Sequence, residues 1–320
     1  MKSVALAADR GQASRRRSEA GFSLPELLIA TTIMLIISGT VTSALLQMTN
    51  TQHTIWNRTE LHAGVRSATE LLQQEVGQAG RITLPTAVTL TAAVAAGAQS
   101  VTVSSTSGIF VGEQLVVGAG QNSETVTVLT VTLASNTITA NSFTGSTGFY
   151  YAHPNADLVQ AYGGFSSGVV PTNMANGSTG TVLKIYGDIN GDGNMVYVEY
   201  TCDTVGGYLY RNMTAWNAAI KPAVTADKIL LANVVANPGG AACFTYQQST
   251  VNAVTYVTDV AITLTVETQQ LDRITKQYQL ETKALLNVSP RNVFNVWELA
   301  SQGSYYRVQP TPPTITALLP

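Results

Sequence analysis

Residues 21–46 read GFSLPELLIATTIMLIISGTVTSALL, and this stretch decides how the 320-residue chain is built. From Leu27 to Leu46 it holds 20 consecutive residues without a charge. As an α-helix at about 1.5 Å per residue, such a run spans roughly 30 Å, which is the thickness of one bilayer hydrocarbon core. The stretch therefore predicts a membrane-spanning helix close to the N-terminus.

The charges around this run predict its orientation. Five basic and two acidic residues give residues 1–21 a net charge of +3, which leaves −5 on the rest of a chain whose total is −2. The next charge after Glu26 is Arg58, so the positive-inside rule keeps the N-terminus in the cytoplasm and places the bulk of the chain outside. An ordinary secretory signal ends in a small-residue cleavage site. Here no A-x-A-like site follows the run, and the small Gly21 precedes it.

Glu26 is the unusual residue of this segment, because a lone carboxylate at the start of a membrane helix is costly and usually has a functional partner. The alternative is an interfacial acid on a simple signal anchor. Gly21, Phe22, the Pro25-Glu26 pair and the uncharged run closely resemble the class III signal of type IV prepilins and type II secretion pseudopilins. The resemblance implies that a prepilin peptidase removes the leader, residues 1–21, by cutting the Gly21–Phe22 bond, and that it methylates Phe22. It also implies that Glu26, the fifth mature residue, recruits and registers each subunit beside the Phe22 amino group of a neighbour.

The helix is expected to continue past the membrane, over residues 22–82 in all. Apolar or small residues recur in steps of three and four, which makes one helical stripe that should pack on a globular head. Gly80 and Pro85 mark its end. The stripe consists of Leu61, Val65, Ala68, Leu72, Val76 and Ala79, and the charged residues of the segment, among them Glu75, lie mostly off it.

Residues 83–160 change character and predict an inserted small β-barrel or sandwich. Short runs rich in β-branched residues, such as 100–103, 114–117, 124–128 and 136–139, follow one another at about ten-residue spacing. The stretch resembles a small β-module of bacterial and phage surface proteins, which implies a structural or adhesive role, and His153 is expected to pack within it.

Residues 161–300 resemble the sheet-rich head of PilW- and PulJ-type minor pilins, and the Pro-rich tail, 301–320, is expected to be extended. The predicted fold class is thus α+β, a long transmembrane helix on an antiparallel β-sheet head with an all-β insertion.

The sharpest local motif is the loop 188–194, which together with Glu199 fits the D-x-[DN]-x-[DN]-G-x5-E pattern of a calcium site. Alternating oxygen side chains around a glycine turn suit calcium, but the flanks read as strands, and the same residues form ordinary turns. The candidate ligands are Asp188, Asn190, Asp192, Asn194 and Glu199, of which Glu199 is the least secure. No other cofactor is required by the sequence.

Two cysteines, Cys202 and Cys243, lie in the head. In an exported protein they are expected to form one disulfide; the alternative is two separate buried thiols. Several aromatic residues allow two interpretations. They either form an exposed surface for carbohydrate or protein contact, or pack within the head. These residues are Tyr150, Tyr151, Tyr208, Tyr210 and Trp216.

The composition limits the classes of function. With 11% charged and 45% hydrophobic residues the chain is not wholly disordered, and it has no basic patch that would make nucleic acid its main partner. None of the common catalytic motifs occurs.

The sequence therefore favours a non-enzymatic minor pilin or pseudopilin that primes or caps a filament. Its expected partners are the prepilin peptidase, other major and minor pilins, the inner-membrane assembly platform and, before assembly, membrane lipid. Its expected places are the bacterial inner membrane and the extracytoplasmic filament. The alternatives are an adhesin that uses the inserted module and a membrane-tethered enzyme.

Overall fold

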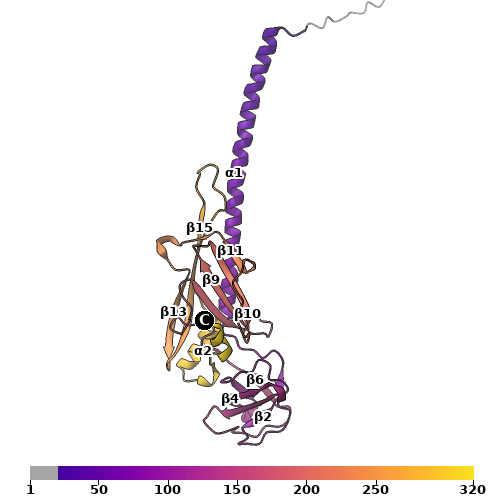
Figure 1. Cartoon of the computed structure of the whole chain (residues 1–320), viewed down its shortest axis with the longest axis vertical. Helices are drawn as coiled ribbons and strands as arrows, with labels where there is room; N and C mark the ends of the chain where they lie inside the picture. The colour runs from indigo at the N-terminus through magenta and orange to yellow at the C-terminus, as the bar shows by residue number, and fades with distance from the viewer. Residues whose placement is uncertain (1–20) are drawn as a thin grey trace, which may run out of the picture. The chain divides into compact units, whose positions relative to one another are not determined.

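The computed structural model describes residues 21–320 (Figure 1). The chain divides after Thr54 into an N-terminal unit and a larger unit, Ile55–Pro320. A single helix, α1, runs from Leu24 to Gln78. All six residues of the predicted stripe are buried, from Leu61 at 9% exposure to Ala79 at 0%, so the stripe is confirmed. The helix stops where Gly80 takes a left-handed φ of 83°, a conformation that glycine adopts without steric cost.

A six-stranded antiparallel sheet lies within residues 88–161 and is compatible with an inserted module. Its spatial order is β1-β6-β3-β4-β5-β2, and a bridge between Leu90 and Val103 joins the two outer strands. The sheet encloses its own apolar core, which includes Leu115, Val126 and Ile138. The strands are β1 (Val88–Thr89), β2 (Ser100–Thr102), β3 (Gln114–Val117), β4 (Glu124–Thr132), β5 (Thr137–Ser142) and β6 (Leu158–Ala161).

Two further antiparallel sheets form the head around the lower part of α1 (Figure 1). The first has the order β11-β10-β9-β8; in the second, β14 pairs with β12, β13 and β15. Side chains from both sheets and from the α1 stripe share one core. The strands are β8 (Val182–Gly187), β9 (Val196–Asp203), β10 (Tyr208–Ala215), β11 (Ile229–Ala232), β12 (Val234–Val235), β13 (Phe244–Val251), β14 (Val254–Glu267) and β15 (Leu280–Val288). The α+β fold class is confirmed.

Strands β8 and β9 are buried on both faces. One face, with Leu183 and Val198, packs in the core that contains α1. The opposite face, with Tyr186 and Tyr197, packs against the C-terminal residues. This second cover explains why almost every residue of β8 is buried instead of every other one.

The C-terminal tail is not extended, so that expectation is wrong. Ile315, Leu318 and Leu319 are buried against the second face of β8 and β9, and a short helix presents these apolar side chains to one face, which an extended chain would not. The segments here are α2 (Arg291–Ser301), η5 (Tyr305–Arg307), β16 (Val308–Gln309), which pairs in parallel with β7 (Gly164–Phe165), and α3 (Pro313–Leu318). Short 3-10 turns complete the elements at η1 (Gly120–Asn122), η2 (Leu133–Ser135), η3 (Ala226–Lys228) and η4 (Pro238–Gly240).

Candidate functional site

The predicted processing point lies just ahead of α1. Gly21, Phe22 and Ser23 are not helical, and Phe22 is 83% exposed. A peptidase needs an accessible, unfolded peptide bond, and the Gly21–Phe22 bond is in that condition here. The rest of the predicted leader, residues 1–20, lies outside the described residues.

Ser23 and Glu26 form a reciprocal cap at the start of α1. The backbone N–H and the hydroxyl of Ser23 donate to Glu26 Oε2 at 3.0 and 2.9 Å, and the N–H of Glu26 donates to Ser23 Oγ at 3.4 Å. This is the S-x-x-E capping box, in which the acid sits at the third helical position. Pro25 lies in the first turn, where its missing N–H costs nothing. Glu26 therefore has a local structural role in the single subunit, and its carboxylate stays exposed.

The apolar run suits a hydrocarbon environment. Every residue from Leu27 to Leu46 is exposed, and α1 is the one helix among residues 21–320 that is long and apolar enough to cross a membrane. The hydroxyls of Thr31, Thr32 and Thr40 donate to carbonyls three or four residues earlier at 2.7–3.0 Å. Their polar groups are thus satisfied within the helix, which lowers the cost of placing them in lipid.

Near the C-terminal end of α1, a buried ion pair connects the helix to the head. Arg211 Nε donates to both carboxylate oxygens of Glu75 at 3.0 and 3.2 Å, and the Tyr200 hydroxyl donates to Glu75 Oε2 at 2.6 Å. Burial raises the pKa of the Tyr200 hydroxyl, and the charge of Glu75 raises it further. From its sequence position Glu75 is expected among the charges that lie mostly off the stripe. Its spacing, three residues after Leu72, is the signal that puts it at the edge of the buried face.

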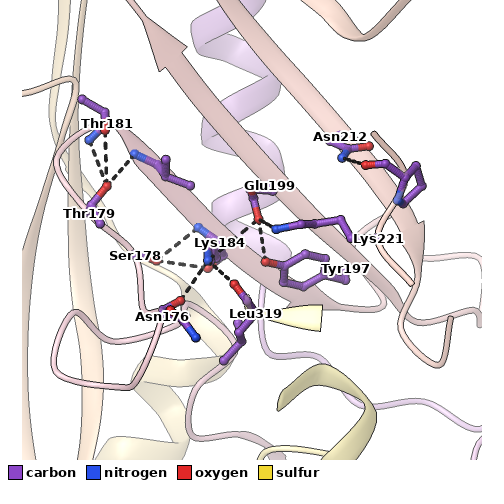
Figure 2. Close-up of polar contacts among 12 residues, drawn as sticks. Asn176, Ser178, Thr179, Thr181, Lys184, Tyr197, Glu199, Asn212, Lys221 and Leu319 are labelled. Carbon is purple, nitrogen blue, oxygen red and sulfur yellow. Dashed lines mark hydrogen bonds and ion pairs between the residues drawn. The ribbon is translucent and has the colours of Figure 1, made fainter. Parts of the chain in front are cut away.

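A second polar cluster lies on the other face of the β8–β9 hairpin (Figure 2). Glu199 Oε2 accepts from the Tyr197 hydroxyl and from Lys221 Nζ, both at 2.9 Å, and lies 4.0 Å from Lys184 Nζ. Lys184 also donates to the backbone carbonyls of Asn176 and Leu319. Burial lowers the pKa of the Lys184 ammonium, and the Glu199 carboxylate partly offsets this. The cluster thereby holds the C-terminal end of the chain against the sheet.

The predicted calcium ligands do not all come together. Glu199 pairs in register with Lys184, four residues before Asp188, so it is about 13 Å along the strand from the loop and is engaged by lysines. Asp188 accepts the backbone N–H groups of Asp192 and Gly193 at 3.0 and 3.3 Å and lies 3.7 Å from Arg81. Within residues 21–320, no three His, Cys, Asp or Glu side chains gather where they could hold a metal ion. Calcium binding stays a prediction, and it rests on the four loop side chains without Glu199.

Cys202 and Cys243 are joined in the structure, with their Cα atoms 6.4 Å apart. Cys202 lies on β9 of the first head sheet, and Cys243 immediately precedes β13 of the second. The bond therefore fastens the two head sheets together beside the shared core.

The comparisons with known proteins bear on the N-terminal signal. Residues 16–42 match the family model of the prokaryotic N-terminal methylation motif. No curated protein matches the chain, and neither does any solved structure. The matched range contains Gly21, Phe22, the Ser23–Glu26 cap and the first part of the membrane-spanning run. The motif, and the exposed apolar helix that it opens, support a type IV pilin-like protein.

Proposed function

We propose that this chain is a minor subunit of a type IV pilus or of a type II secretion-like pseudopilus, of the PilW or PulJ type, which primes or caps the filament. The observation that carries the proposal is the methylation motif at residues 16–42. It opens a helix whose apolar run from Leu27 to Leu46 is exposed along its whole length. Such a surface needs lipid or other helices to cover it.

The proposed mechanism is assembly. A prepilin peptidase cuts the Gly21–Phe22 bond and methylates Phe22, and the inner membrane holds the helix until the assembly platform transfers it to the filament. There the Glu26 carboxylate pairs with the Phe22 ammonium of a neighbouring subunit, so that two charges in an apolar surrounding satisfy each other. The accessible Gly21–Phe22 bond and the exposed Glu26 carboxylate support both steps.

The minor role is supported by the bulk of the head. The sheet within residues 88–161 adds a separately cored module to the pilin-type helix and sheet. A module of this size would crowd a densely repeated fibre, whereas a tip or a rare position accommodates it. The proposal is of a structural role without catalysis, and other pilins are the partners.

Three variants test the role of Glu26 and separate its two functions. Glu26→Gln keeps the capping box, because glutamine also serves at that position, but it removes the charge. Ser23→Ala weakens the cap and keeps the charge, and Glu26→Ala removes both. If the charge registers subunits, Glu26→Gln and Glu26→Ala are processed yet missing from sheared filaments, while Ser23→Ala is incorporated. Incorporation of Glu26→Gln at the normal level would refute the pairing with Phe22.

A second experiment tests the minor role itself. Mass spectrometry of sheared filaments should find a peptide that begins with N-methylated Phe22, at a small fraction of the abundance of the main subunit. Deletion of the chain should reduce the number of filaments per cell. A subunit as abundant as the main pilin, or an unchanged number of filaments, would overturn the assignment. An adhesive role of the module is the alternative, and it depends on a separate surface.

A further inference from the structure

A cleft of about 430 Å³ opens on the six-stranded module, and aromatic side chains surround it. Four rings line it: Phe143, Tyr150, Tyr151 and Tyr306, with exposed fractions of 36 to 56%. Three come from the module, and Tyr306 comes from η5 of the C-terminal tail. Four part-exposed rings around one hollow are more than the isolated surface aromatics that a folded protein normally shows.

The rings stand in two edge-to-face pairs. Tyr150 and Tyr151 have centroids 4.8 Å apart at 88°, and Phe143 and Tyr306 have centroids 6.3 Å apart at 70°. In such a pair the edge of one ring meets the face of the other, so each pair leaves ring faces outside the contact. The Arg307 guanidinium lies 4.2 Å over the Tyr162 ring and 5.4 Å from the Tyr306 ring, which holds the tail segment in place.

A buried polar network supports the Tyr150–Tyr151 pair. The carboxylate of Glu124 accepts the backbone N–H of Tyr150 at 2.8 Å and that of Tyr151 at 2.9 Å. His153 contacts Glu124 Oε1 through Nε2 and Asp157 Oδ2 through Nδ1, each at 2.9 Å. The side chain of His153 is fully buried and that of Glu124 is 5% exposed.

Burial of a carboxylate and an imidazole is costly unless each is bonded, and here both are. His153 is therefore buried within the module, as expected, and its two ring nitrogens contact Glu124 and Asp157. The network fixes two consecutive backbone N–H groups, and with them the position of two exposed rings. A binding surface that is rigid before its ligand arrives loses less conformational entropy on binding.

The chemistry of the lining points to an uncharged ligand. Among residues 21–320, Glu124 is the only acidic residue that lines the cleft, and both of its oxygens already accept hydrogen bonds; no Lys or Arg side chain of this part of the chain lines it. A charged ligand would lose its hydration without a free charged side chain in the lining to pair with it. What the lining does offer is ring faces, tyrosine hydroxyls and the hydroxyls of Ser123, Thr125 and Thr144.

We propose that this cleft binds a neutral carbohydrate. A pyranose ring presents C–H groups on one face, which stack on aromatic rings, and hydroxyls around its rim, which exchange hydrogen bonds with Ser, Thr and Tyr. A neutral sugar therefore matches both the ring faces and the hydroxyls of the lining. The site does not depend on whether the chain primes a filament, because its residues lie in the module and the tail.

Binding can be tested with the full mature chain in lipid nanodiscs, which avoid sugar-based detergents. The probe is a printed array of neutral mono- to tetrasaccharides, and calorimetric titration follows with each sugar that binds. Tyr150→Ala and Tyr306→Ala should each weaken binding about tenfold or more, as loss of a central aromatic contact does. Tyr278→Ala is the matched control, because Tyr278 is 49% exposed and lies in the β14–β15 loop outside the cleft.

Each outcome decides the proposal. Binding that the two cleft variants lose and the Tyr278 variant keeps supports it, provided that all three retain the melting temperature of the parent chain. No binding of any neutral sugar at millimolar concentration overturns it. Equal loss in all three variants, or binding of acidic sugars alone, also overturns it. If the cleft variants instead abolish only contact with a protein partner, the surface is a protein interface and the carbohydrate assignment is wrong.

Discussion

Truncation of Glu75 should loosen the head from α1 while it leaves every apolar contact of the stripe in place. In Glu75→Ala the Arg211 guanidinium loses its carboxylate partner and the Tyr200 hydroxyl loses its acceptor. The side chains of Glu75 and Arg211 are 6% and 21% exposed, so the guanidinium that remains is not fully rehydrated after the change. Removal of one member of a fully buried pair costs about 3–5 kcal/mol. Because Arg211 keeps some access to water, the low end applies, and we expect a loss of about 3 kcal/mol.

The expected effect is large enough to measure by thermal unfolding. A loss of about 3 kcal/mol lowers the folding equilibrium constant roughly 150-fold. For a unit of this size each kcal/mol lowers the melting temperature by about 2–4 °C, so the shift should be about 6–12 °C. The assay is the near-ultraviolet circular dichroism of the mature chain in detergent, because tyrosines of the head report its packing. The apolar helix in the micelle contributes little to that signal.

Glu70→Ala is the control for this prediction. Glu70 pairs with Arg66 one turn away, but their side chains are 61% and 77% exposed, so the substitution should cost under about 0.5 kcal/mol. The double variant Glu75→Leu with Arg211→Met removes both charges and should recover much of the loss, since an apolar pair can replace a buried ion pair. If Glu75→Ala melts together with Glu70→Ala, the network does not stabilise the contact between α1 and the head.

Three further predictions concern the head. Reduction of the Cys202–Cys243 bond, which closes a loop of 41 residues, should destabilise the head by about 3–4 kcal/mol; a melting temperature that a reductant leaves unchanged would contradict this. Burial raises the pKa values of Tyr197 and Tyr200, so the protonated tyrosines favour the folded state. Their contribution is constant below about pH 10, where free tyrosine ionises, and is lost above it. The part of the rise in absorbance at 295 nm that comes from buried tyrosines should therefore coincide with unfolding, and completion of the whole rise while the chain is still folded would refute the assignment. If the four side chains of the 188–194 loop bind calcium, the chelator EDTA should lower the melting temperature and added calcium should restore it; a melting temperature that EDTA leaves unchanged would refute calcium binding.

Much of the fold follows from patterns that are local in the sequence. The steps of three and four from Leu61 to Ala79 are sufficient to orient a helix, since the period of the helix is fixed by its backbone geometry. The β-branched runs likewise predict strands, because alternate side chains of a strand face opposite sides. The N-terminal signal is also local: Gly21, Phe22 and Glu26 lie within six residues, and their chemistry depends on that spacing alone.

The sequence by itself therefore determined the membrane helix, its buried stripe, the strand content and the processing signal. Only the tertiary structure decided the partners of charged and polar side chains, because these meet across large separations that no local period encodes. Glu75 is buried because Arg211, 136 residues away, neutralises it, and Glu199 is drawn to two lysines instead of to the loop. The end of the C-terminal tail folds into the short helix α3 because the outer face of β8 and β9 offers it an apolar surface. The aromatic cleft exists because the same tail brings Tyr306 to Phe143.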